Sequence, residues 1–183
     1  MTAESRVVLD AEGMRRTLWR LAHEVVERSD ERHPLLLVGI ERRGSQLAGR
    51  LGTLIAQADG AVPEVWPIDT TPFRDDERRQ GVAQPPAISA AGRQVVIVDD
   101  VLFTGRTARA AIDAVLAAGR PEVIRLLVLV DRGHRELPIR PDFVGKNIPT
   151  AKQDEVVVHL AEVDGVDEVL VVGHSVESAA TNL

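Results

Sequence analysis

The sequence predicts an α/β fold in which a central parallel sheet is covered by helices on both faces. Short apolar runs recur along the chain and predict buried strands, as at Leu35–Ile40 and Val123–Val130. Between these runs lie segments whose apolar residues recur at helical spacing, which is typical of amphipathic helices. Neither an internal repeat nor a linker composition divides the chain, so we expect one domain over residues 1–183.

The first third of the chain predicts a helix, a strand, a second helix and a second strand. Asp10 can cap the first helix through its side chain. The first strand is Leu35–Ile40, helical spacing resumes over Gln46–Ala58, and Ala61–Ile68 predicts the second strand. The first helix is expected to bury its apolar residues, which are Met14, Leu18, Leu21, Ala22 and Val25.

The middle third combines a long polar excursion with a strand and a helix. Asp69–Arg93 is rich in charge, proline and glycine, and this composition predicts a solvated, mobile loop. Gln94–Val98 predicts a third buried strand, and Thr107–Ala118 predicts a helix with one apolar face.

The last third shows weaker patterns. Asp131–Thr150 has no clear periodicity, is rich in proline and arginine, and is expected to be irregular. Val156–Leu160 and Glu168–Val172 predict two short strands. Residues 174–183 show no pattern, so we expect a frayed tail.

Composition limits the class of protein. The chain has no cysteine, which excludes disulfides and thiolate metal sites. It has neither an apolar run long enough for a membrane span nor a secretory signal pattern, so we expect a cytoplasmic protein without membrane contact. The net charge of −6 argues against a general nucleic-acid binder but is compatible with a local basic face.

A phosphate and ribose site is predicted at Val95–Thr107, which reads VVIVDDVLFTGRT. Asp99 and Asp100 end an apolar strand at its carboxyl end, where open parallel sheets bind their ligands. Thr104–Thr107 then leads into a helix whose first backbone N–H groups suit a phosphate dianion. Two adjacent carboxylates can accept hydrogen bonds from the vicinal hydroxyls of a ribose. These features together describe a site for a ribose 5-phosphate.

The same string resembles the signature with which type I phosphoribosyltransferases bind 5-phosphoribosyl 1-diphosphate (PRPP). The resemblance implies that Asp99 and Asp100 hold the ribose hydroxyls, contact Mg²⁺ mostly through PRPP, and belong to the catalytic residues. It also implies that the loop after them contacts the substrate, through Val101, Leu102, Phe103, Thr104, Gly105, Arg106 and Thr107.

A second loop is expected beside the first. Arg42, Arg43 and Gly44 follow the strand Leu35–Ile40, where a small residue permits close approach and the arginines supply charge for a pyrophosphate. Taken alone, this triplet is more often a solvated helix start. In the family that the chain resembles, this position is the pyrophosphate loop, and the resemblance implies a catalytic role for Arg43.

The excursion Asp69–Arg93 lies where the family has a flexible lid over PRPP. Arg74 lies in an aromatic-Arg-Asp-Asp pattern of the family, and the resemblance implies that it reaches the pyrophosphate when the lid closes. Charged loops of this kind are otherwise only solvated. Pro72 departs from the family pattern, and since proline cannot donate a backbone hydrogen bond, a paired strand is not expected here.

The segment Asp131–Thr150 resembles the PyrR family, whose members are pyrimidine-operon attenuation regulators and uracil phosphoribosyltransferases. The resemblance extends over nearly the whole chain and implies that this segment forms a hood over the base. Phe143 and Val144 are expected to flank a planar ring, and Arg132 is expected to approach the ligand. Without the resemblance, a proline-rich surface loop is the simpler interpretation.

The resemblance implies that the protein converts uracil and PRPP to UMP and pyrophosphate with Mg²⁺. It further implies UMP-dependent binding of pyrimidine-operon mRNA and assembly into dimers or larger homo-oligomers. Two alternatives remain: a non-catalytic regulator that only senses UMP, and a salvage transferase without an RNA role. Trp19, on the polar side of the first helix, is expected to stack on a base or to mark an oligomer contact. The residues expected to bind RNA are Arg16, Arg20, His23, Arg28, His134, Arg140 and Lys146.

Overall fold

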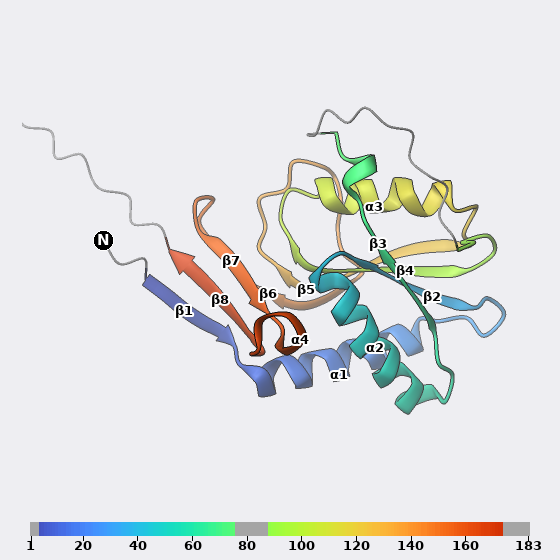
Figure 1. Cartoon of the computed structure of the whole chain (residues 1–183), viewed down its shortest axis with the longest axis horizontal. Coiled ribbons are helices and arrows are strands. Elements are labelled where there is room, and N and C mark those ends of the chain that lie inside the picture. The colour runs from blue at the N-terminus through green and yellow to red at the C-terminus, as the bar shows by residue number, and fades with distance from the viewer. Residues whose placement is uncertain (1–3, 76–87, 174–183) are drawn as a thin grey trace, which may run out of the picture.

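The structure, a computed structural model, describes residues 4–75 and 88–173. In these residues a five-stranded parallel sheet has the order β3-β2-β4-β5-β6 (Figure 1). This confirms the predicted α/β class. The strands are β2 (Leu35–Ile40), β3 (Glu64–Ile68), β4 (Gln94–Leu102), β5 (Val123–Asp131) and β6 (Phe143–Asn147).

Helices cover both faces of this sheet. The helices α1 (Ala11–Glu27) and α2 (Arg43–Asp59) lie on one face, and α3 (Arg106–Ala117) lies on the other (Figure 1). Alternate residues of β4 therefore belong to different cores: Val96 packs toward α1 and α2, whereas Ile97 packs toward α3. A strand covered on both faces is apolar throughout, which is why the sequence predicted it.

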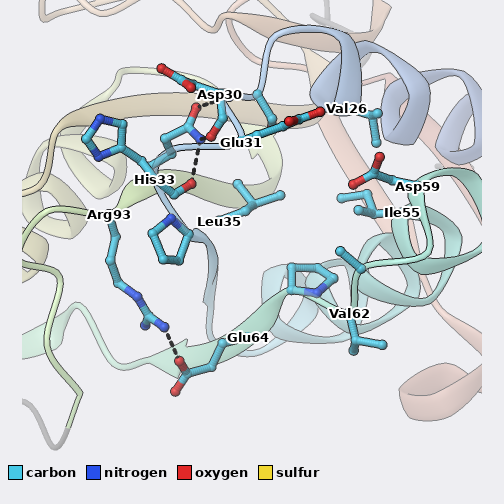
Figure 2. A pocket seen from close by; sticks show the side chains of 15 residues that line it. Val26, Asp30, Glu31, His33, Leu35, Ile55, Asp59, Val62, Glu64 and Arg93 are labelled. Atoms are coloured by element: carbon cyan, nitrogen blue, oxygen red, sulfur yellow. Dashed lines mark hydrogen bonds and ion pairs between the residues drawn. The ribbon is translucent and has the colours of Figure 1, made fainter.

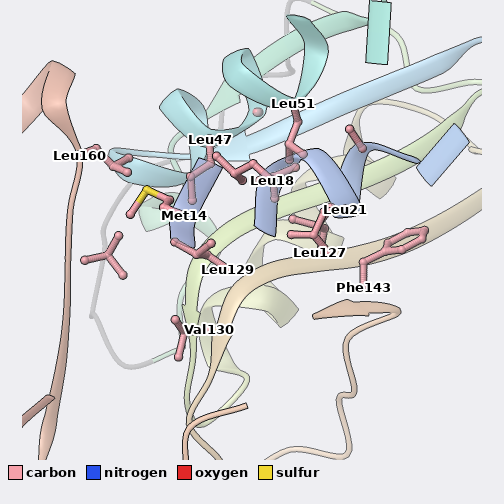
Figure 3. Close-up of a cluster of buried hydrophobic side chains, with 14 of the residues drawn as sticks. Met14, Leu18, Leu21, Leu47, Leu51, Leu127, Leu129, Val130, Phe143 and Leu160 are labelled. Carbon is pink, nitrogen blue, oxygen red and sulfur yellow. The ribbon is translucent and has the colours of Figure 1, made fainter. Parts of the chain in front are cut away.

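The larger core lies between α1, α2 and the sheet. Leu18 and Leu21 of α1 and Leu47 of α2 meet Leu127 and Leu129 of β5 (Figure 3). The five apolar residues predicted to be the inward face of α1 are all buried. The predicted N-cap is confirmed as well, since the Asp10 carboxylate accepts a hydrogen bond of 2.7 Å from the Gly13 N–H.

A second, antiparallel sheet has the order β1-β8-β7, from β1 (Glu4–Leu9), β8 (Glu168–Gly173) and β7 (Glu155–His159). The two predicted late strands are thus confirmed within one residue, whereas the sequence did not indicate β1. A short helix, α4 (Ala161–Asp164), joins β7 to β8. This small sheet, and not residues 131–150, is the separate layer beside the main sheet (Figure 1).

The segment 131–150 differs from the expected irregular hood. Its residues 143–147 form β6, an edge strand that pairs in parallel with β5. Phe143 is 1% exposed and packs in the larger core, so the expectation that its ring flanks a base is corrected. The ring is buried because residue 143 points to the α1 face of the sheet, where the Arg28 guanidinium lies 5.1 Å from its centroid.

Pro72 has the predicted consequence. Residues Thr71–Phe73 form a single 3₁₀ turn and not a paired strand. Residues 76–87 of the predicted lid and the predicted tail 174–183 lie outside the described residues. Within 4–75 and 88–173, no helix has the length and apolar character needed to cross a bilayer.

Candidate active site

The candidate site begins with two adjacent carboxylates near the carboxyl end of β4. Asp99 is only 7% exposed, while Asp100 is half-buried. The Asp99 carboxylate accepts a 2.9 Å hydrogen bond from the Asp100 N–H, and the Asp100 carboxylate accepts one of 2.8 Å from the Val101 N–H. Burial, and then the neighbouring charge of Asp100, raise the pKa of Asp99 well above its ordinary value. A perturbed carboxyl of this kind is typical of a functional site.

The loop after these carboxylates encloses a small hollow. Gly105 has φ +91°, a left-handed conformation that favours glycine, and it precedes the first turn of α3. The hollow has a volume of about 210 Å³ and lies at the amino end of α3, where unpaired N–H groups favour an anion. It brings together Arg74, Asp99 and the whole run of residues 101–108.

A neighbouring segment fixes the orientation of this loop. Arg135 donates hydrogen bonds to the carbonyl of Phe103 at 3.0 Å and to that of Leu102 at 3.4 Å. The Thr104 carbonyl accepts hydrogen bonds from the N–H groups of Glu136 and Leu137 at 3.0 and 3.1 Å. In a trans peptide the N–H points away from the carbonyl, so the Gly105 N–H faces the other side of the loop. Residues 135–137 therefore hold the predicted phosphate loop from one side.

The predicted pyrophosphate loop lies directly beside Asp99. A Cβ on Gly44 would lie 2.4 Å from the Val98 carbonyl oxygen and 3.3 Å from the Asp99 Cα. Gly44 therefore permits a close approach between the backbone of this loop and the backbone of β4. Arg42 is exposed at the start of α2, and the peptide between Glu41 and Arg42 is cis.

Arg43, the second arginine of this loop, is engaged in a forked ion pair. Its Nη2 lies 3.0 Å from Oδ1 of Asp164 and its Nε lies 3.3 Å from Oδ2. Asp164 belongs to α4, 121 residues further along the chain, and no local sequence pattern indicates this pairing.

The start of the predicted lid is held against α3. Asp75 pairs with Arg106 at 2.9 Å and with Arg109 at 3.5 Å. Arg109 also donates to the Phe73 carbonyl at 3.3 Å. Arg74, between these two contacts, is one of the residues that line the hollow.

Arg132 packs against Phe103 of the predicted phosphate loop. It is 7% exposed, its guanidinium stands 4.2 Å from the centroid of the Phe103 ring, and burial lowers its pKa. Its Nη2 donates to the Ala151 carbonyl at 3.1 Å, while no described residue pairs with its buried Nε. Val144 faces the α3 side of the sheet and, with Arg132 and Arg140, lines a shallow hollow of about 500 Å³.

The cations predicted to bind RNA lie in two places. One group lies along α1 and β6, where most side chains also contact carbonyl groups of the protein. Arg20 donates to the carbonyls of Val144 at 3.1 Å and Gly145 at 2.7 Å, which ties α1 to β6. The second group, His134 and Arg140, lies on the loop between β5 and β6. The first group consists of Arg16, Arg20, His23, Arg28 and Lys146.

A metal would need ligands from the substrate at this site. In residues 4–75 and 88–173, no cluster of three His, Cys, Asp or Glu side chains is arranged to hold a metal ion. The pair Asp99 and Asp100 fits Mg²⁺ only together with oxygens of a bound phosphosugar, because magnesium prefers octahedral oxygen coordination.

Another hollow lies at the opposite end of the sheet, at the amino ends of β2, β3 and β4. Its volume is about 640 Å³, and Leu35, Ile55 and Val62 give it an apolar lining (Figure 2). Its arginine, Arg93, is paired with Glu64. Ligands of parallel sheets bind at the carboxyl ends of the strands, so this hollow is not the candidate active site.

Comparisons with known proteins show the family to which this chain belongs. The phosphoribosyl transferase domain family matches residues 7–162. Bifunctional protein PyrR of Halalkalibacterium halodurans is 48% identical over 174 residues, which cover 91% of this chain and 97% of that protein. The pyrimidine operon regulatory protein of Lactococcus lactis subsp. lactis is 46% identical over 164 residues, covering 90% and 95%.

Solved structures show the same fold at low sequence identity. Hypoxanthine phosphoribosyltransferase of Trypanosoma cruzi, in complex with the product IMP, has a TM-score of 0.69 at 21% identity, covering 94% of this chain and 91% of that one. The Staphylococcus aureus hypoxanthine phosphoribosyltransferase has a TM-score of 0.70 at 19% identity, covering 97% and 94%. The domain match and the near-complete relatives together show that this chain belongs to the PyrR family of phosphoribosyltransferases.

Proposed function

We propose that this protein transfers the phosphoribosyl group of PRPP to uracil, giving UMP and pyrophosphate. The observation that supports it most is the hollow at the start of α3, where the phosphate loop, Asp99 and Arg74 meet. The Arg42–Gly44 loop adjoins the same carboxylate. Phosphate, ribose and pyrophosphate binding thus fall at one edge of the sheet.

Catalysis by this site rests on positioning and electrostatics. The N–H groups of residues 104–107 bind the 5-phosphate, and Asp99 and Asp100 accept hydrogen bonds from the ribose hydroxyls. Arg43 and Arg74 stabilise the negative charge that develops on the leaving pyrophosphate. Bound Mg²⁺ would neutralise further charge on those oxygens, held by Asp99 or Asp100 together with the substrate.

Uracil as the acceptor is proposed from two observations. Segment 131–150 resembles PyrR closely, and the relatives at 46–48% identity carry names that refer to PyrR or to the pyrimidine operon. Arg132 and Val144 line the same hollow beside the phosphate loop, which is compatible with their predicted place near the base. Phe143 takes no part, since it is buried in the core.

Incubation of the purified protein with Mg²⁺, PRPP and labelled uracil tests the transfer directly. We expect labelled UMP and one pyrophosphate for each UMP. Hypoxanthine and guanine serve as matched acceptors, and uracil should be preferred. Binding of PRPP without turnover on any acceptor would contradict the enzymatic proposal and favour the UMP-sensing regulator.

We further propose that the protein binds pyrimidine-operon mRNA in the cytoplasm when UMP is bound. As a separate proposal, which rests on the family resemblance, the protein is a homo-oligomer. The observation that favours RNA binding is the surface of α1, where Trp19 is 45% exposed and its ring lies 4.6 Å from that of His23. Titration of labelled leader RNA with and without UMP tests this role. Weak binding that ignores UMP would favour a salvage enzyme without an RNA role, and light scattering gives the oligomeric state.

A further inference from the structure

Arg43, which we propose binds pyrophosphate, already forms an ion pair with a carboxylate of the protein, that of Asp164. We propose that Asp164 is the resident counter-ion of Arg43, positions it beside the candidate site, and is exchanged for pyrophosphate when PRPP binds. This inference rests on the proposed function, because it needs pyrophosphate to be a ligand of the Arg42–Gly44 loop. Asp164 is a positioning residue, since it acts through Arg43.

The geometry of the pair suits such an exchange. Both oxygens of Asp164 face the guanidinium fork of Arg43, at 3.0 and 3.3 Å, in the arrangement that a phosphate oxygen pair also adopts with arginine. The Arg43 side chain is 33% exposed and that of Asp164 is 20% exposed, so an incoming ligand can reach the pair. A partly exposed ion pair contributes little to stability and is therefore easily replaced by a stronger anion.

Asp164 is held in place independently of Arg43. Its Oδ2 accepts a 2.9 Å hydrogen bond from the Leu160 N–H at the start of α4. That hydrogen bond, and then Arg43, lower the pKa of Asp164, so the carboxylate stays charged at neutral pH. When Arg43 turns to pyrophosphate, the Leu160 hydrogen bond keeps the carboxylate in its position.

The ion pairs of a second arginine in α2, Arg50, can be compared with that of Arg43. Arg50 lies two helical turns after Arg43 and pairs with Glu162 at 2.5 Å and Asp167 at 2.7 Å. Its side chain is 22% exposed and has two carboxylate partners. Arg50 therefore also holds α4 and the residues after it against α2, through Glu162 and Asp167, so the Arg43 pair can exchange while these contacts remain.

The test is the affinity for inorganic pyrophosphate with Mg²⁺, measured by titration calorimetry. Asp164→Asn keeps an acceptor for the Leu160 N–H but removes the competing charge. We expect pyrophosphate to bind about 2- to 5-fold more tightly, the range that a partly exposed ion pair allows. Product inhibition by pyrophosphate should strengthen by the same factor, whereas UMP affinity should not change.

Two variants serve as controls. Asp167→Asn removes a carboxylate from the Arg50 contact, and pyrophosphate affinity should stay at the wild-type value. Asp164→Glu retains the charge and should restore wild-type affinity. Unchanged or weaker pyrophosphate binding in Asp164→Asn, with an unchanged melting temperature, would overturn the exchange. If wild-type protein binds UMP and PRPP but all variants bind pyrophosphate with the same affinity, this inference alone is refuted. If wild-type protein binds none of these ligands, the proposed function is refuted as well.

Discussion

Replacement of Gly44 by alanine should disable the site while leaving the fold intact. The new Cβ would lie 2.4 Å from the Val98 carbonyl oxygen, and real Cβ contacts begin near 3.0 Å and become ordinary at 3.4 Å. Because both partners are backbone, the loop must move by about 0.6 to 1.0 Å away from β4. A displacement of about 1 Å between reacting groups lowers rates roughly 100-fold. We therefore expect kcat/KM for UMP formation to fall by about two orders of magnitude.

Gly49 provides the matched control on the same helix. A Cβ at this exposed position meets nothing within 4 Å. Gly49→Ala should stabilise the protein by about 0.5–1 kcal/mol, because alanine is the better helix former, and should raise Tm by up to about 4 °C without changing kcat/KM. Steady-state kinetics and thermal melts of both variants give the comparison. Gly44→Ala with kcat/KM within threefold of wild type would refute the assigned position of the loop.

Two further variants test the assignments of Phe143 and Asp99. Phe143→Ala should lower the free energy of unfolding by about 3–5 kcal/mol in a urea titration, because the ring is 1% exposed in the core. An increased KM for uracil with unchanged stability would show that the ring contacts the base after all. Because the pKa of Asp99 is raised, the folded protein binds the Asp99 proton more tightly than the unfolded chain does. Protonated Asp99 therefore adds to the stability of the fold at low pH, and this stabilisation is lost as the pH rises through the pKa of the folded state. Asp99→Asn should therefore abolish transfer yet melt above wild type at pH 8, and the gain should shrink toward pH 4; a variant that melts lower at pH 8 would contradict the burial argument.

Much of the main sheet could be predicted from the sequence because its strands are covered on both faces. The apolar run at Gln94–Val98 has this origin, although β4 continues to Leu102 through the two aspartates. β1 and β6 could not be found in this way. The β6 residues Phe143–Asn147 are only partly apolar because this edge strand ends at the surface, and β1 pairs with residues of β8 that lie 160 to 169 positions further along the chain.

Local sequence patterns likewise indicated some parts of the candidate site and not others. The proposed phosphate loop could be derived from the sequence because its residues are consecutive between Asp99 and Thr107, so a single string suggests the chemistry. The Arg43–Asp164 pair depends on how the small sheet lies beside α2, and no local pattern expresses that. Phe143 was misassigned because the direction of its side chain depends on the register of β6 against β5.

The surface of α1 shows why charge alone is a poor guide to RNA contacts. Arg20 was predicted to bind RNA, yet its guanidinium already holds two carbonyls of β6 and pairs with Glu24 at 2.5 Å. Its replacement by alanine should lower Tm, so a loss of RNA binding in that variant would not identify a contact. Trp19 is the sharper test, because its exposed ring offers a stacking surface that the fold does not need.

Alanine at position 19 should weaken UMP-dependent binding of leader RNA about 5- to 150-fold, since a stacked base contributes roughly 1–3 kcal/mol. Trp19→Phe should restore most of the affinity because phenylalanine retains an aromatic face. Arg16→Ala should instead reduce the salt dependence of binding by about one counterion, as expected for a phosphate contact. If Trp19→Ala binds RNA like wild type but changes the mass measured by light scattering, the ring lies in a contact between copies of the chain, and the RNA surface must be sought on the loop that carries His134 and Arg140.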